Sequence, residues 1–336
     1  MNIVYLIGNG FDLNLDMKTK FEHFNDYFLF NPRDGDSPHI KKLKDEIEDD
    51  KENWSDLEHA LGNYLSKLDE NEAITLHRHL IIHLSKYIAY EEDRCIFGEG
   101  QKSRFWEYLK YPYSNNRLLF AEQNEIDDYS MNFRSHSVDI KIITFNYTRL
   151  IEKLSEYVNN TLQIGTQKHN NTLYSINLSE IEHVHGIADE RMILGVNDVS
   201  QIANKKLQDK AAVIDRYVKP ACNSTYGLMH DEKCQQWIQK ANLLCLFGLS
   251  FGDTDKKWWE LVGQALTKGC RTILFEHNLE KTFDGNQGPD IKEGKEAVKD
   301  RFLSKTNLDE GLRSKIKKIM YVAYNTDMFK LDVSFK

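Results

Sequence analysis

Four short segments contain the residue types that could bind a nucleotide and act on it. They are Gly8-Asn9-Gly10-Phe11-Asp12, Thr144-Phe145-Asn146-Tyr147-Thr148, His183-Val184-His185-Gly186 and Gly248-Leu249-Ser250-Phe251-Gly252-Asp253-Thr254-Asp255. Each follows an apolar run that the sequence predicts as a strand. Ligands of open α/β sheets bind outside the carboxyl ends of the strands, so these segments form the candidate site.

The first segment follows the unbroken apolar run from Ile3 to Ile7, which predicts a buried parallel strand. Gly8 and Gly10 allow a sharp turn and a close approach of the backbone to a ligand. A helix from about Leu13 would then aim its free N–H groups at an anion such as a nucleotide phosphate. Leu13 stands where the dinucleotide fingerprint has a third glycine, so a tight turn without a ligand remains the alternative.

An amide and two imidazoles follow two later strands. The Asn146 side chain can donate and accept, which suits a ribose hydroxyl or a water, but it could instead cap a helix starting at Tyr147. His183 and His185 titrate near neutrality, so either could be a general base. The alternative for each is a buried histidine bonded to a backbone carbonyl.

A second strand-to-glycine turn follows the run from Leu243 to Phe247. Gly248 and Ser250 in this turn could face the first glycine turn across the crevice of the sheet. Asp253 or Thr254 could instead cap the helix predicted from Lys256.

The composition is typical of a globular protein, and the charge favours a small, metabolite-sized partner. The chain has 336 residues and a formal net charge of −8, which disfavours a dedicated duplex-DNA binder. Five scattered cysteines form no Cys-x-x-Cys pair, so we expect neither a disulfide framework nor a zinc ribbon, and a cytoplasmic location. We expect neither a signal peptide nor a membrane span.

Alternating strands and helices predict a doubly wound, mostly parallel α/β sheet of the Rossmann type. Residues 1–31 would supply its first strand and helix, 32–138 a helical insertion, and 139–336 the remainder. Further strands are expected at 139–145, 181–185, 192–196, 243–247, 272–275 and 319–323. Helices are expected at 148–158, 204–218 and 256–268, and a surface loop at 278–294.

Together, the four segments and Trp54-Ser55-Asp56-Leu57-Glu58 resemble the AbiH family of bacteriophage abortive-infection proteins over nearly the full chain. More distantly, they resemble sirtuin-like NAD-binding domains, including enzymes that destroy NAD when phage infects. Those domains have a Gly-Ala-Gly turn, a Thr-x-Asn-x-Asp stretch, a His-Gly pair and a Gly-x-Ser turn.

The resemblance implies NAD as a substrate, with its phosphates against the Gly8 and Gly248 turns and no metal required. Asn146 would hold the nicotinamide ribose or the attacking water, and His185 would act as the general base. The nucleotide site would comprise Gly8, Asn9, Gly10, Phe11, Asp12, Thr144, Asn146, Gly248, Ser250 and Asp253.

Two residues depart from the sirtuin-like pattern. Thr148 stands where those domains have an aspartate that contacts nicotinamide, and Asp12 stands where they have a serine. A carboxylate beside a pyrophosphate is repulsive, by about 1 kcal/mol at 4 Å in water and more when desolvated. Asp12 is therefore expected to point away or to contact a ribose hydroxyl or a cation.

Three functions follow from these residues. The first is an NAD-hydrolysing antiphage enzyme that responds to a phage-derived trigger or a partner defence protein. It could also form a homo-oligomer. The second is a Mg²⁺-dependent phosphohydrolase or nuclease that uses Asp12, Asp253, Asp255 and Glu58. The third is a nucleotide-binding infection sensor without turnover.

Overall fold

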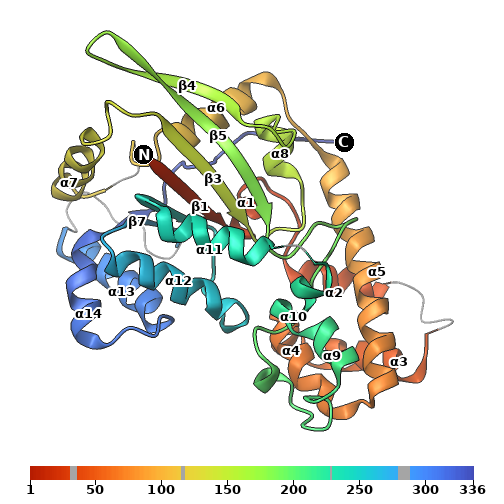
Figure 1. The fold of residues 1–336 in the computed structure, drawn as a ribbon. Coiled ribbons are helices and arrows are strands. Elements are labelled where there is room, and N and C mark those ends of the chain that lie inside the picture. Colours follow the sequence, from red (N-terminus) through yellow and green to blue (C-terminus); the bar gives the residue numbers. More distant parts are fainter. Residues whose placement is uncertain (31–35, 115–117, 228, 279–287) are drawn as a thin grey trace.

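Strand β1 (Asn2–Ile7) lies at the centre of the sheet in the computed structural model (Figure 1). The model describes residues 1–30, 36–114, 118–227, 229–278 and 288–336, and within them the sheet has seven strands in the order β4-β5-β3-β1-β6-β7-β8. Neighbouring strands run parallel except β4, which runs antiparallel to β5. The predicted doubly wound, mostly parallel sheet is confirmed.

The other strands of this sheet are β3 (Val138–Thr144), β4 (Leu162–His169), β5 (Thr172–His183), β6 (Leu243–Phe247), β7 (Arg271–Glu276) and β8 (Met320–Tyr324). A separate pair consists of β2 (Cys95–Ile96) and β9 (Ser334–Phe335).

Both faces of the central strand are buried, because successive side chains of a strand point to opposite sides. Tyr5 and Ile7 pack into a core with helices α6 (Glu99–Lys110), α7 (Phe120–Met131) and α8 (Leu150–Ser155). Val4 and Leu6 pack on the other face, under α11 (His230–Lys240), α12 (Lys256–Thr267) and α13 (Gly288–Ser304). This double burial explains why the run from Ile3 to Ile7 shows no polar alternation.

A third core lies beside the sheet, in what we call the helical body (Figure 1). Its helices are α2 (Phe21–Phe30), α3 (Pro38–Asp49), α4 (Leu57–Tyr64), α5 (Glu70–Arg94), α9 (Ala211–Tyr217) and α10 (Lys219–Thr225). The boundaries predicted for a helical insertion at 32–138 stay a prediction. Helices α6 and α7 of that segment place Phe105, Leu109 and Ile126 in the sheet core.

Several element boundaries differ from the sequence predictions. Residues 192–196 do not form a strand; Val196 instead makes a single bridge to Val218, at the junction of α9 and α10. The strand predicted at 181–185 begins at Thr172 and pairs with β4, a hairpin that the alternation of strands and helices did not predict. In 278–294, residues 279–287 lie outside the described residues, and from Gly288 the chain is helix α13 rather than a loop.

Two helices are several residues shorter in the structure than the sequence predicts, and a third begins earlier. The helix expected at 148–158 is α8 (Leu150–Ser155), and the one expected at 204–218 is α9. The helix expected from about Leu13 is the five-residue α1 (Gly10–Asn14), which begins inside the glycine turn. The remaining helix, α14, spans Glu310–Ile316. Among the described residues, no helix combines the length and apolarity that crossing a bilayer requires.

The two glycine turns are in direct backbone contact. The Gly10 N–H donates to the Gly248 carbonyl at 2.9 Å, and the Gly8 N–H donates to the Phe247 carbonyl at 2.9 Å. A Cβ on Gly10 would lie 2.4 Å from the Gly248 Cα, so the two turns tolerate no side chain between them. Gly248 also has a φ of +67°. These glycines therefore allow β1 and β6 to end side by side, and the amides of Gly8 and Gly10 are occupied within the protein.

We predict that Gly248→Ala destabilises the fold more than Gly227→Ala does. Gly227 has a similar φ of +62° but nothing within 4 Å of its would-be Cβ, so both variants carry a left-handed backbone cost of about 1 kcal/mol. Gly248→Ala alone adds a backbone clash, worth about 1–3 kcal/mol. Urea unfolding of both variants measures the difference, and equal losses of stability would contradict the close contact.

Candidate functional site

A cavity of about 1250 Å³ opens at the carboxyl ends of the central strands. It lies where the chain order reverses around β1, which has β3 on one side and β6 on the other. Eight of the predicted site residues line it: Gly8, Asn9, Gly10, Asp12, Asn146, His185, Gly248 and Ser250. Residues of the helical body line the opposite side, among them Phe24, Glu58 and Leu84.

Three predicted site residues do not line this cavity. Phe11 is fully buried in the sheet core, where its ring meets Phe329 edge-on. Thr144 is buried and its hydroxyl accepts the Asn146 N–H at 3.2 Å, so it supports the site from behind. Asp253 is exposed and pairs with Lys305 at 2.8 Å.

Asn146 is held by the carboxyl group of Asp12. Its Nδ2 donates to Asp12 Oδ1 at 2.7 Å, and the Thr148 hydroxyl donates to Asp12 Oδ2 at 2.9 Å. The Asp12 carboxyl oxygen is an acceptor, and this assigns the amide nitrogen, Nδ2, to the side that faces it. The amide oxygen, Oδ1, is buried and has no hydrogen-bond partner among the described residues. Helix α8 begins only at Leu150, so Asn146 does not cap it. The side chain thus offers an unused acceptor in the wall of the cavity.

Asp12 and Thr148, the two departures from the sirtuin-like pattern, are therefore partners. Burial raises the pKa of Asp12 to about 7, although the hydrogen bonds from Thr148 and Asn146 lower it. The carboxyl group carries only part of a negative charge at neutral pH. Its two oxygens accept hydrogen bonds from Asn146 and Thr148, although the residue lines the cavity.

Of the two histidines, His183 is the one whose ring nitrogens both contact protein oxygen atoms. Its Nδ1 lies 2.8 Å from the Asn146 carbonyl and its Nε2 lies 2.7 Å from Glu152 Oε1. Burial alone would lower its pKa, but the Glu152 carboxylate, the Asn146 carbonyl and Glu182 together outweigh burial and raise the pKa above its usual value. With both nitrogens facing oxygen atoms, the ring fixes the backbone of Asn146.

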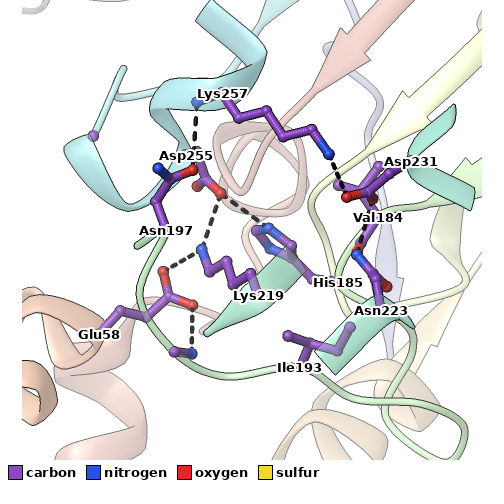
Figure 2. Close-up of polar contacts among 12 residues, drawn as sticks. Glu58, Val184, His185, Ile193, Asn197, Lys219, Asn223, Asp231, Asp255 and Lys257 are labelled. Atoms are coloured by element: carbon purple, nitrogen blue, oxygen red, sulfur yellow. Dashed lines mark hydrogen bonds and ion pairs between the residues drawn. The ribbon is translucent and has the colours of Figure 1, made fainter. Parts of the chain in front are cut away.

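His185 lies at one end of a buried chain of charged groups (Figure 2). Its Nε2 is 3.0 Å from Asp255 Oδ1, and the same oxygen accepts from Lys219 Nζ at 2.9 Å. Lys219 Nζ also reaches Glu58 Oε2 at 2.7 Å, while Glu58 Oε1 accepts the Gly195 N–H at 3.3 Å. The order Glu58–Lys219–Asp255–His185 is called the charge chain below.

Local features of the sequence place Glu58, Lys219 and His185 in the charge chain. Asp56 caps α4 by accepting the His59 N–H, which puts Glu58 in the first turn. Lys219 begins α10, just before a proline suited to a helix start. Gly186, with a φ of +71°, turns the chain beyond β5 so tightly that a Cβ would lie 1.8 Å from the Arg191 carbonyl oxygen.

The charges in this chain depend on one another. Burial would raise the pKa of Asp255, but Lys219 and His185 outweigh burial and hold it well below its usual range. Burial raises the pKa of Glu58, against the attraction of Lys219. Burial would lower the pKa of Lys219, yet the carboxylates of Asp255 and Glu58 raise it. Lys219 is therefore a cation and Asp255 an acceptor.

The position of Asp255 orients the imidazole. Its Oδ1 lies 3.0 Å from His185 Nε2, and an ionised carboxylate can only accept, so a proton on Nε2 would face an acceptor and leave Nδ1 as the acceptor of the ring. A histidine oriented by a carboxylate is the arrangement of a general base. The carboxylates of the metal-dependent hypothesis, in contrast, are separated: Asp253 lies at the surface, and Lys219 stands between Glu58 and Asp255.

Sequence reasoning missed Lys219. Its only local signal is a lysine before Pro220 in an otherwise apolar stretch, a pattern equally typical of a surface helix start. The sequence analysis names Glu58 and Asp255 as possible metal-binding carboxylates, but their shared partner, Lys219, lies 161 and 36 residues away from them in the chain.

The fold is that of an α/β protein with a doubly wound sheet, and its cavity opens at the switch point, where ligands of such sheets bind. Comparison with family models gives the particular group. The model described as bacteriophage abortive infection AbiH matches residues 4–277, and the chain belongs to this family, which associates it with defence against phage. No curated protein matches the chain.

We predict that Asp12→Asn stabilises the protein at neutral pH but not in acid. The folded pKa of Asp12 is raised to about 7, so its protonated form contributes stability below about pH 4 that is lost as the pH rises to 7. The asparagine cannot ionise, so its advantage over wild type should grow by about 1.4 kcal/mol per pH unit between pH 5 and 7 and then level off. Urea unfolding at several pH values tests this, and parallel stability curves would contradict it.

Proposed function

We propose that this protein binds NAD in the cavity and hydrolyses it to nicotinamide and ADP-ribose during abortive infection. One observation carries the proposal: Asn146 and His185 line the same cavity, beside the paired glycine turns. The resemblance to sirtuin-like NAD-binding domains expects this set of residues around the nicotinamide ribose.

The size of the cavity supports a dinucleotide. Pockets for drug-sized ligands usually measure about 300–1,000 Å³, and this cavity has about 1250 Å³. The amides of Gly8 and Gly10 bond to residues 247 and 248, so these amides do not supply the phosphate contacts. Ser250, an exposed hydroxyl in the wall, is the better candidate for a phosphate donor.

The reaction needs no group beyond substrate, water and these side chains. Water attacks C1′ of the nicotinamide ribose, the C1′–N bond breaks, and its electron pair leaves with neutral nicotinamide. His185 Nδ1 takes the proton of the attacking water, and the unused Oδ1 of Asn146 accepts from the ribose hydroxyl or the water. The transition state resembles an oxocarbenium ion, as in glycoside hydrolysis.

We predict that purified protein, once activated, releases nicotinamide in the presence of a chelator, and that His185→Ala lowers kcat by about 10²–10⁴-fold. His136→Ala is the matched control, because this exposed histidine precedes β3 at the opposite edge of the sheet. Chromatography of nicotinamide and ADP-ribose gives the rates, and circular dichroism checks that both variants fold.

Other results would identify the other candidate functions. Undiminished nicotinamide release by the His185 variant would remove its role as base. Activity that disappears with the chelator would point to a metal-dependent enzyme. Tight NAD binding by calorimetry without turnover under activating conditions would point to a sensor.

A further inference from the structure

We propose that Lys219 and Glu58 are positioning residues that set the net charge around His185 and thereby its ability to take a proton. This inference rests on the proposed function, because it assigns the control of the base in that reaction. Neither residue is assigned a contact with the substrate.

Burial makes the position of Lys219 decisive. The residue is only 5% exposed, and its Nζ lies between Glu58 Oε2 at 2.7 Å and Asp255 Oδ1 at 2.9 Å. A buried ammonium without such partners would be strongly unfavourable, so the two carboxylates hold it in one place. Since Asp255 Oδ1 also contacts His185 Nε2, the ammonium and the imidazole share a single oxygen.

The charges of the chain add up to favour proton uptake by His185. With a neutral imidazole, Glu58, Lys219 and Asp255 carry −1, +1 and −1, so the chain has a net charge of −1. A proton on His185 brings the sum to zero, which a buried site favours. The phenol of Tyr147, whose pKa burial raises well above its usual value, also faces Glu58 and Asp255 but stays neutral.

Removing one charge at a time should therefore shift the base in opposite directions. Lys219→Met removes the cation that shares Asp255 Oδ1 with His185. Glu58, whose pKa burial raises, is then expected to be neutral. The Asp255 carboxylate alone faces the imidazole, and the acid limb of the pH–kcat profile should move up by about 1 unit. Glu58→Gln leaves a net charge of zero and should move the limb down. Lys219→Arg keeps the charge and should retain a profile close to wild type.

Two further variants separate charge from packing. The double variant Glu58→Gln with Lys219→Met leaves Asp255 as the charged group beside His185, as does Lys219→Met with a neutral Glu58, so its limb should move up as in that single variant. Lys295→Met also removes a buried lysine from a carboxylate, Glu122 at 2.6 Å, but away from the cavity. It should lower stability and leave the limb unchanged.

A readout without substrate tests the inference independently of NAD hydrolysis. In ¹⁵N NMR of the full chain labelled at histidine, with His185→Gln for assignment, the neutral ring of residue 185 should be protonated at Nε2. Its titration midpoint should move up in Lys219→Met and down in Glu58→Gln, relative to wild type.

The outcomes distinguish the two proposals. Opposite NMR shifts in a protein that never releases nicotinamide would support the positioning pair and overturn the proposed function. The positioning pair would be overturned if the protein releases nicotinamide but the acid limb of its pH–kcat profile and the NMR midpoint of His185 stay in place in both single variants. It would also be overturned if they move in the same direction in both.

Discussion

The contact between the two glycine turns is the constraint on which the site depends. Gly10 and Gly248 touch through their backbones, which brings the ends of β1 and β6 together at the point where the chain order reverses. With no side chain between the turns, the crevice beyond them remains open as a cavity. A backbone contact within the chain is enough to require these glycines. The fingerprint-like spacing thus arises from how two strands end.

Around this crevice the protein buries several titratable side chains and places each beside a polar or charged partner. His183 is fixed between a carbonyl and a carboxylate, and Asp12 between an amide and a hydroxyl, so both residues serve to hold Asn146. His185 belongs to a different set, which includes Lys219 and two acids. Two histidines two residues apart therefore have distinct roles, because β5 ends at His183 and the chain turns before His185.

The sequence was sufficient for the central parallel strands and for the residues that follow their carboxyl ends. Apolar runs buried on both faces identify parallel strands, and strand ends in such a sheet meet at one edge, so residues such as Gly8, Asn146 and His185 could be grouped without coordinates. The hairpin of β4 and β5 was not predicted, although residues 174–179 alternate apolar and polar side chains, because a pattern of strands separated by helices gives no place to two consecutive antiparallel strands. Lys219 was missed because a buried lysine is defined by its partners, and Glu58 and Asp255 lie on other elements.

The charge chain also crosses the boundary between two cores. Glu58, on α4, and Lys219, beside Tyr217 and Val218, are anchored in the helical body. Asp255 precedes α12, whose tryptophans pack under the sheet. The Lys219–Asp255 ion pair is thus a joint between the two parts of the molecule. If the two parts moved a few ångströms apart, Asp255 would lose the Lys219 ammonium, so the charge beside His185 depends on how the helical body packs against the sheet.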